Sequence, residues 1–279
     1  MIKATEADRA EIEAFLDPRS EYAMFPLNNL RHHGMVGGHP YAVTLWIARR
    51  HGAISDVLTQ TETGMVFPYL ISGDYGAAAA ALRGRDVFGM VGCRDFVRGL
   101  EAATGLLDAA KTLDHDEPHF LLDLADLALP DGAGRIVPLA DAPEAVIKSW
   151  MLDYQISTLN TPAAEAPQRV ADSYAHYVGS GSHVVLMTGD TPLAMTGFNA
   201  RLPDIVQIGG VYTPPELRGR GHARLAVALH LAQARFAGVR RATLFSASDM
   251  AARAYRAIGF RDIGLWTLLI FAVKEVVRG

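Results

Sequence analysis

Glycine and arginine are concentrated in one short segment of the chain, residues 218–223, which read RGRGHA. Two prolines lie just before the segment, and a long helical pattern, Gly221–Ala237, begins inside it. Glycine lets the backbone approach a ligand closely, and the first turn of a helix carries unpaired N–H groups and a partial positive charge. The segment therefore predicts an anion site at a helix N-terminus, of a kind suited to a pyrophosphate.

Two common phosphate-binding motifs do not fit this segment. A Walker loop needs Gly-Lys followed by Ser or Thr, and the chain contains no such sequence. A dinucleotide fingerprint could begin at Gly219 and Gly221, but Arg224 stands where the third glycine belongs. The acidic residue that would hold a ribose about 20 residues later is also missing.

Residues 218–223 resemble the [Arg/Gln]-x-x-Gly-x-[Gly/Ala] signature of the GNAT acyl-CoA N-acyltransferases. Residues 248–260, which read SDMAARAYRAIGF, resemble a second block of that family, Asn-x-x-Ala-x-x-x-Tyr-x-x-x-Gly-Phe. The order of predicted strands and helices in residues 134–279 is similar to the family's order as well. The resemblance implies that acetyl-CoA is the co-substrate, and that its acetyl group passes to a primary amine by direct attack in a ternary complex. The acceptor would be a small molecule or a protein amine.

The resemblance also assigns residues to the cofactor. In this fold the strand before the glycine-rich segment separates from its neighbour, and its free backbone groups would hydrogen-bond the pantetheine arm. These groups belong to Val211, Tyr212 and Thr213. The pyrophosphate would be held by the backbone N–H groups of Arg218, Gly219, Arg220, Gly221, His222 and Ala223. The N–H near Val211 could also polarise the thioester carbonyl. Ser248 stands where the family often has an asparagine that touches the cofactor.

Tyr255 falls where the family keeps its tyrosine general acid. A phenol with a pKa of about 10 stays protonated at neutral pH and can donate to the departing thiolate. Many relatives carry a glutamate base on the strand before the loop, but Ile205–Gly210 contains no carboxylate. Asp204, or a water bridged by Gln207 or Asn199, could take that role, and the sequence leaves these alternatives open.

The remaining chemistry-bearing residues favour structural roles. His32 and His33, and the acidic and histidine-rich residues 114–119, match no recognised ligand spacing, so no metal site is predicted. Residues 114–119 are interpreted as a solvated acidic turn. Residues 179–183 lack the nucleophile elbow of serine hydrolases and are interpreted as a loop. Cys93 is expected to be a small buried hydrophobe.

A cluster of turn-forming residues at 130–134 separates two halves that each read as a mixture of strands and helices. The predicted fold class is α/β (α+β mixed), with two GNAT-like domains, 1–133 and 134–279, each a mostly antiparallel twisted sheet flanked by helices. The final strand, Leu265–Ala272, is expected to close the second domain. In the first domain, residues 72–77 (SGDYGA) stand where the pyrophosphate loop would be. They contain an aspartate and no arginine, so this domain is expected to be a degenerate copy that binds no cofactor and shapes the acceptor pocket.

Composition limits the remaining classes of function. The 279 residues are 50% hydrophobic, but no apolar run approaches the ~20 residues of a membrane-spanning helix. The net charge of −4 argues against nucleic-acid binding, and the single cysteine suits a reducing compartment. We therefore expect a cytoplasmic protein with no membrane or nucleic-acid partner. A non-catalytic acyl-CoA sensor, or a structural domain without cofactor, are the alternatives to an enzyme.

Overall fold

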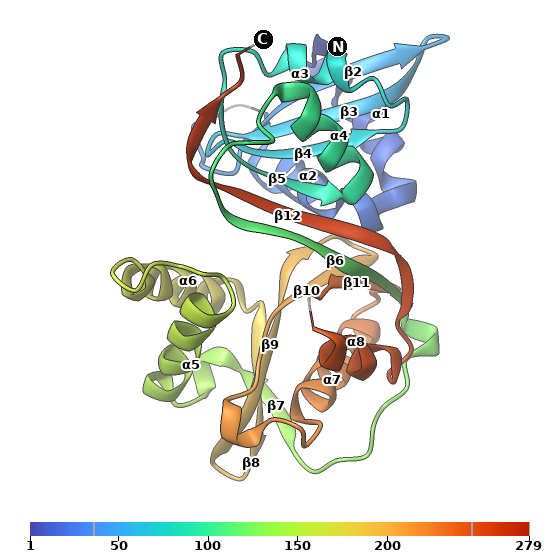
Figure 1. The fold of residues 1–279 in the computed structure, drawn as a ribbon. Coiled ribbons are helices and arrows are strands. Elements are labelled where there is room, and N and C mark those ends of the chain that lie inside the picture. The colour runs from blue at the N-terminus through green and yellow to red at the C-terminus, as the bar shows by residue number, and fades with distance from the viewer. Residues whose placement is uncertain (36, 247, 279) are drawn as a thin grey trace. The chain divides into compact units, whose positions relative to one another are not determined.

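The computed structural model describes residues 1–35, 37–246 and 248–278, and Figure 1 shows its helices and strands. Its contacts divide the chain into two compact units. Unit 1 consists of Met1–His119 with Ile263–Gly279, and unit 2 consists of Phe120–Asp262. The division differs from the predicted one at residue 133, because the last strand of the chain pairs with strands of unit 1.

In the described residues of unit 1, the strand order is β1-β2-β3-β4-β5-β12-β6. The strands are β1 (Ile2–Lys3), β2 (Val43–Arg50), β3 (Ala53–Thr61), β4 (Met65–Leu70), β5 (Asp86–Cys93), β6 (Lys111–Asp123) and β12 (Arg261–Val276). β6 belongs to unit 1 up to residue 119 and to unit 2 from residue 120. The pair β4–β5 is parallel, and the pairs β1–β2, β2–β3, β3–β4 and β5–β12 are antiparallel.

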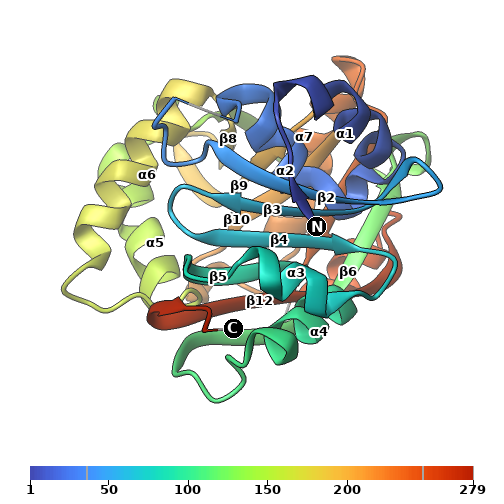
Figure 2. The same ribbon diagram turned by 90° about the horizontal axis from the view of Figure 1, so that it is seen from above.

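Helices cover both faces of the unit 1 sheet, as Figure 2 shows. They are η1 (Glu6–Asp8), α1 (Arg9–Leu16), η2 (Asp17–Arg19), α2 (Ser20–His33), α3 (Tyr75–Ala81) and α4 (Arg94–Thr104). Strand residues alternate between the two faces of the sheet. Trp46 packs with α3 and α4 on one face, and its neighbours Leu45 and Ile47 are buried on the opposite face. Each large apolar side chain buried in this way contributes about 2 kcal/mol.

In the described residues of unit 2, the strand order is β6-β11-β10-β9-β8-β7. The further strands are β7 (Arg135–Pro138), β8 (His183–Thr188), β9 (Thr191–Arg201), β10 (Ile205–Tyr212) and β11 (Arg241–Phe245). The helices are η3 (Leu124–Asp126), η4 (Leu139–Asp141), α5 (Glu144–Ser157), α6 (Ala166–Ser180), η5 (Pro215–Leu217), α7 (His222–Phe236) and α8 (Asp249–Arg256). Together the units give the predicted mixed α/β fold, in which most of the strand pairs are antiparallel.

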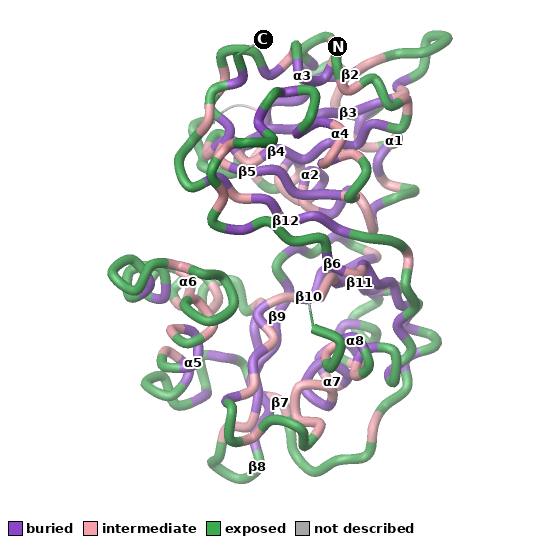
Figure 3. The backbone as a smooth tube through the Cα atoms, viewed as in Figure 1, coloured by how far each residue is buried: buried purple, intermediate pink, exposed green. Residues whose placement is uncertain are grey.

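The unit 2 sheet separates two hydrophobic cores. On one face, α7 and α8 pack on residues such as Val206 and Ile208. On the other face, α5 and α6 pack on residues such as Val185, Met195 and Tyr212. Figure 3 shows that the strands are largely buried, whereas much of α6 is exposed. The β10 strand therefore lies between the helix that starts at the glycine-rich segment and the helical pair α5–α6.

The prediction of a solvated turn at residues 114–119 is wrong, because these residues form part of β6. The acidic side chains that suggested a turn are paired with arginines of α4: Asp116 contacts Arg94 and Arg98, and Asp114 also contacts Arg98. Glu117 is buried instead. Ion pairing to a neighbouring helix thus allows an acidic segment to form a strand.

Candidate functional site

The β10 strand has two halves with different neighbours. Residues Ile205–Gln207 pair in parallel with β11, whereas the described residues from Ile208 to Tyr212 make no ladder pairs with that strand. On its other side, β10 pairs with β9 along most of its length. The second half of β10 thus presents one row of backbone groups that no strand occupies, which agrees with the separation expected from the sequence.

Two register shifts distort this second half of β10. One lies between Gln207 and Ile208, and the other lies between Gly209 and Tyr212. Gly210, inside the second shift, has a φ of +60°, a conformation that glycine adopts without strain. Such bulges redirect peptide groups out of the regular ladder. The peptide groups around Val211 are therefore available to a ligand along the open side of the strand.

The turn after β10 leads directly into α7. Gly219 and Gly221 have φ values of +75° and +81°, and Gly221 is the N-cap residue of the helix. No side chain caps this end of α7. The first N–H groups of a 15-residue helix are thus left without a capping side chain, which favours binding of an anion.

Arginines add positive charge around this helix end. The Arg218 Nε donates to the Thr213 carbonyl at 2.9 Å, and its guanidinium lies 5.8 Å from the Tyr212 ring centroid. Arg220 is exposed. The Arg224 Nη2 lies 3.5 Å from where a Cβ on Gly221 would be placed, so this side chain reaches the N-terminus of α7. In the part of the chain that the structure describes, the Arg218, Arg220 and Arg224 side chains form no ion pair.

Two buried polar atoms near the same turn have no hydrogen-bond partner among the described residues. They are the Thr213 Oγ1 and the Arg224 Nε. Burying an unsatisfied polar atom is unfavourable, so both atoms are suited to a ligand that supplies oxygens and N–H groups. A pantetheine pyrophosphate is such a ligand, and the residues of β10 and α7 fit it.

The Tyr212 side chain has a structural role that the sequence did not indicate. Its hydroxyl donates to the Asp153 carboxylate of α5 at 2.6 Å, and its ring lies 5.9 Å from the Trp150 ring. Burial, together with the hydrogen bond to Asp153, raises the pKa of Tyr212 to about 12. The hydroxyl therefore stays protonated and attaches α5 to the end of β10.

The second sequence block forms α8 and the residues around it. The Ser248 Oγ accepts a hydrogen bond from the Ala251 N–H at 3.3 Å, so Ser248 is the N-cap of α8. Tyr255 is buried between Phe120 and Phe260, with ring centroids 6.4 and 5.9 Å away. It belongs to the core cluster against which Val211 also packs. The fold thus places Tyr255 and the open half of β10 in one neighbourhood.

The three candidates for the base lie in different surroundings. The Asp204 carboxylate pairs with Arg241 at 2.8 Å, at the end of β10 that is still joined to β11. Asp204 is therefore poorly placed for chemistry at the open half. The Asn199 side chain lies directly over Gly209, where an added Cβ would meet its amide. Gln207 is buried, and its Oε1 has no partner among the described residues.

Sequence reasoning assigned no functional role to His183, the first residue of β8. Its ring lies against Gly197 and Gly210 of the neighbouring strands. Glycines at adjacent positions of a sheet indicate that a large side chain or a ligand crosses them. The glycines at 197 and 210 were thus the sequence feature that could have pointed to the position of His183.

Cys93 behaves as an ordinary structural residue. Cys93 is partly buried, and burial raises the pKa of its thiol, so it is poorly suited to act as a nucleophile. Within residues 1–35, 37–246 and 248–278, no three His, Cys, Asp or Glu side chains are grouped to hold a metal ion. None of the described helices is long and apolar enough to cross a bilayer.

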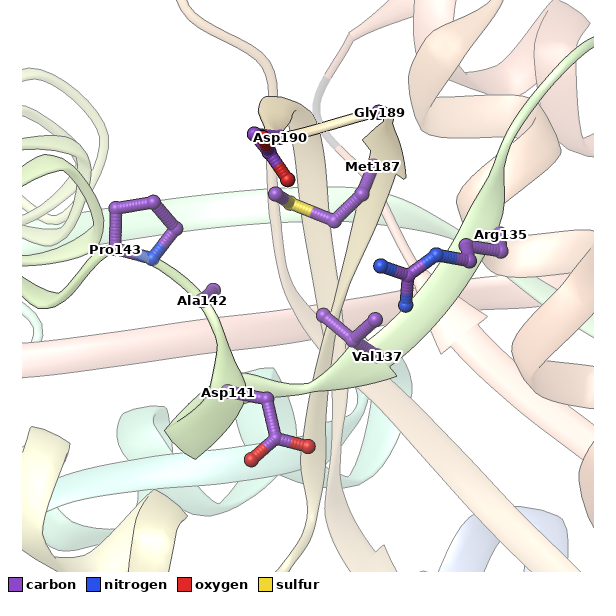
Figure 4. A pocket seen from close by; sticks show the side chains of 8 residues that line it. All are labelled: Arg135, Val137, Asp141, Ala142, Pro143, Met187, Gly189 and Asp190. Atoms are coloured by element: carbon purple, nitrogen blue, oxygen red, sulfur yellow. The ribbon is translucent and has the colours of Figure 1, made fainter.

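A hollow of about 350 Å³ lies elsewhere in unit 2, between β7, the β8–β9 turn and the start of α5. Figure 4 shows the side chains that line it, with Arg135 pointing inward and Asp141 and Asp190 nearby. None of the predicted cofactor or catalytic residues lines this hollow.

Residues 145–260 match the model of the acetyltransferase (GNAT) family. This part of the chain belongs to the GNAT family. The GNAT match includes β10, the glycine-rich turn, α7 and α8, which are the elements that form the candidate site. No curated protein sequence matches the chain.

Solved structures extend the GNAT fold to the whole chain. A tandem GNAT protein from the clavulanic acid biosynthesis pathway is 16% identical, with a TM-score of 0.52 and coverage of 96% of both chains. A GCN5-related N-acetyltransferase from Sphaerobacter thermophilus is 13% identical, with a TM-score of 0.56, and covers 100% of this chain and 95% of its own. A Drosophila protein is 11% identical, with a TM-score of 0.61 and coverage of 96% and 97%. The fold of the whole chain is thus similar to that of a tandem GNAT protein.

Proposed function

We propose that the GNAT domain transfers an acetyl group from acetyl-CoA to a primary amine by direct attack in a ternary complex. The observation that carries the proposal is the uncapped N-terminus of α7, which lies next to the open half of β10. The helix end offers N–H groups and positive charge to a diphosphate. The open strand offers backbone groups to the arm that joins the diphosphate to the thiol.

The proposed roles follow the order of the ligand. The N–H groups of residues 218–223 hold the pyrophosphate, and the backbone of residues 211–213 holds the pantetheine arm. The Val211 N–H polarises the thioester carbonyl as negative charge develops on its oxygen. Ser248 caps α8, and its hydroxyl hydrogen remains available to the cofactor.

The reaction forms an N–C bond between amine and acetyl carbon and breaks the C–S bond of the thioester. The amine nitrogen loses one proton to a water held by Asn199 or Gln207, and the departing sulfur gains one from the Tyr255 hydroxyl. Solvent then returns a proton to Tyr255. No covalent intermediate with the protein is required, which suits the raised pKa of the Cys93 thiol.

Unit 1 takes no part in cofactor binding in this proposal. The Asp74 carboxylate caps α3 and accepts a hydrogen bond from the Ala77 N–H at 2.9 Å. A carboxylate at this helix end repels a phosphate. The acceptor, a small molecule or a protein amine, is bound by the GNAT domain.

The test is Tyr255→Phe, measured by thiol release from acetyl-CoA with a panel of amines and by calorimetric binding of CoA. Removing the general acid is expected to lower kcat about 100-fold, while the affinity for CoA changes less than about twofold. Equal damage to kcat and to affinity would indicate that Tyr255 only packs the core.

The wild-type protein distinguishes the enzyme from the second candidate, a non-catalytic acyl-CoA sensor. That candidate is favoured by one observation: the open half of β10 carries no carboxylate, and Asp204 is already paired with Arg241. CoA binding without acceptor-dependent thiol release would support the sensor. Turnover with any amine of the panel would support the enzyme.

A further inference from the structure

One buried histidine of unit 2 crosses the sheet beside the open half of β10. His183 is 1% exposed, and its ring is stacked on Tyr177 of α6 with 3.5 Å between the ring centroids. A Cβ on Gly197 of β9 would lie 2.2 Å from the ring, and a Cβ on Gly210 of β10 would lie 2.6 Å from its Nε2. The ring thus passes over β9, lies between α6 and the sheet, and reaches β10 at the bulge.

A chain of hydroxyl groups fixes the other side of the ring. The His183 Nδ1 lies 2.8 Å from the Ser182 Oγ, and the Ser182 and Ser180 hydroxyls lie 2.9 Å apart. The Ser180 hydroxyl donates to the His176 carbonyl at 2.8 Å. These hydroxyl groups hold Ser182 against the Nδ1 edge of the ring.

The surroundings of the two ring nitrogens favour one tautomer of His183. A proton on Nε2 would be a buried donor with no partner among the described residues, whereas a proton on Nδ1 can be donated to the Ser182 oxygen. The proton of the neutral ring is therefore on Nδ1, and Nε2 carries a bare lone pair. Burial lowers the pKa of His183 to about 3, so the ring is neutral at neutral pH.

The bare Nε2 lies at Gly210 and has no partner among the described residues. The edge of β10 that faces away from β9 has no strand neighbour at the bulge. The His183 ring is therefore a main constraint on the conformation of the bulge. A larger residue at 210 would collide with the ring. A lone pair also repels a carbonyl oxygen, so a peptide flip that turned an oxygen toward Nε2 would be unfavourable.

We propose that His183 is a positioning residue for acyl transfer, whose ring fixes the Gly210–Val211 peptide so that the Val211 N–H is aimed at the thioester carbonyl. The inference rests on the proposed function, because it needs a thioester at β10. It assigns no contact between His183 and substrate. The residue acts through the backbone of the bulge.

Two substitutions test the contributions of the Nδ1 and Nε2 positions of the His183 ring separately. The amide of an asparagine replaces Nδ1 and keeps the hydrogen bond to Ser182, but it does not extend to Gly210. The amide of a glutamine replaces Nε2 and extends to Gly210. His183→Asn is expected to lower kcat about tenfold or more, with the KM for acetyl-CoA changed less than about twofold, because a small misplacement of a reacting group has a large effect. His183→Gln is expected to keep kcat within about threefold of the wild type.

A size exchange tests whether the ring merely fills space. Gly197→Ala alone places a methyl group against the ring and should lower Tm. The double variant His183→Ala with Gly197→Ala removes that collision and should recover most of the Tm. Its kcat should stay low because nothing then reaches Gly210. Recovery of both Tm and kcat would overturn the proposal.

His230 provides the matched control. It is also buried, it is stacked on Phe198 with 3.8 Å between ring centroids, and its Nδ1 has no partner among the described residues. However, it belongs to α7 on the opposite face of the sheet. His230→Phe should leave kcat unchanged, and an equal loss of kcat in this variant would contradict a specific role for His183.

The wild-type measurement separates failure of this proposal from failure of the proposed function. Absence of thiol release with every amine overturns both. Thiol release by the wild type, together with equal kcat for His183→Asn and His183→Gln, overturns the positioning role alone.

Discussion

The two units contain the same strand-to-helix arrangement with opposite chemistry at the helix end. In unit 1, β4 pairs in parallel with β5 at Met65 and Val66 and then leads to α3. In unit 2, β10 pairs in parallel with β11 over three residues and then leads to α7. In both units the ladder pairs with the parallel neighbour end after two or three residues. Both turns that follow contain glycine with positive φ, but they differ in their charge and in the side chains that cap the helix.

The turn of unit 1 satisfies its own hydrogen-bond donors with carboxylates. The Ser72 N–H donates to Asp56 at 2.8 Å, and the Ala77 N–H donates to Asp74 at 2.9 Å. The turn of unit 2 has glycines with positive φ, no capping side chain and the unpaired Arg224 Nε. The comparison teaches that the fold supplies the helix end in both units, while a few side chains decide whether it is open to a ligand.

The difference between the two helix ends is tested most directly by giving the N-terminus of α7 a carboxylate like the one at the N-terminus of α3. Gly221→Asp places a carboxylate at the N-cap, and aspartate and asparagine both tolerate the left-handed conformation of this residue. We expect the affinity for acetyl-CoA to fall about 100-fold, because two negative charges a few ångströms apart repel by a few kcal/mol near a protein surface.

Gly221→Asn is the matched control for that prediction. It has the same shape and backbone requirement as the aspartate but no charge, so its loss of affinity should be about tenfold smaller. Binding is measured by calorimetry with acetyl-CoA at two salt concentrations. Equal losses in the two variants, independent of salt, would show that backbone strain rather than charge determines the result.

The comparison extends to the titratable groups that each unit buries. In unit 1, burial raises the pKa of Glu117 to about 7 and lowers that of His119 to about 3. In unit 2, burial lowers the pKa of His183 to about 3 and that of His230 to about 4. Glu117 therefore destabilises the folded state as pH rises from its unfolded pKa near 4.5 to above 7. The three histidines destabilise it as pH falls below about 6.5.

Glu117→Gln tests the effect of the buried Glu117 carboxyl on the pH dependence of stability. At pH 5 the wild-type carboxyl is protonated in the folded state, so the substitution should have little effect on stability. At pH 8 it removes the cost of a buried negative charge, and the free energy of unfolding should rise by about 1 to 2 kcal/mol. Thermal unfolding at the two pH values provides the measurement. A variant that is equally stabilised at both values would contradict the raised pKa.

Much of the unit 2 site was predictable because its chemistry is local in sequence. The glycine-rich segment, the prolines before it and the long helix after it occupy consecutive residues, and their spacing alone predicted the turn and the start of α7. The block at 248–260 likewise placed Tyr255 on a helix. These features need only propensity and motif spacing.

Non-local features were not predictable in the same way. The strand at 111–123 depends on ion pairs between its aspartates and the arginines of α4, which are distant in sequence. The final strand joins unit 1 because of pairs such as Trp266 with Cys93, which no local pattern specifies. His183 became recognisable only when Gly197 and Gly210 were brought beneath it.

The smallest expected effect comes from opening the helix end of unit 1. Asp74→Ala removes the cap of α3, and the free energy of unfolding should fall by about 1 kcal/mol, whereas Asp74→Asn keeps a capping side chain and should lose less. Neither variant should bind a second equivalent of acetyl-CoA, because α3 has only seven residues and its turn has no arginine. Calorimetric stoichiometry is the measurement. A second equivalent bound by Asp74→Asn would mean that this single carboxylate, and not the whole turn, closes unit 1 to the cofactor.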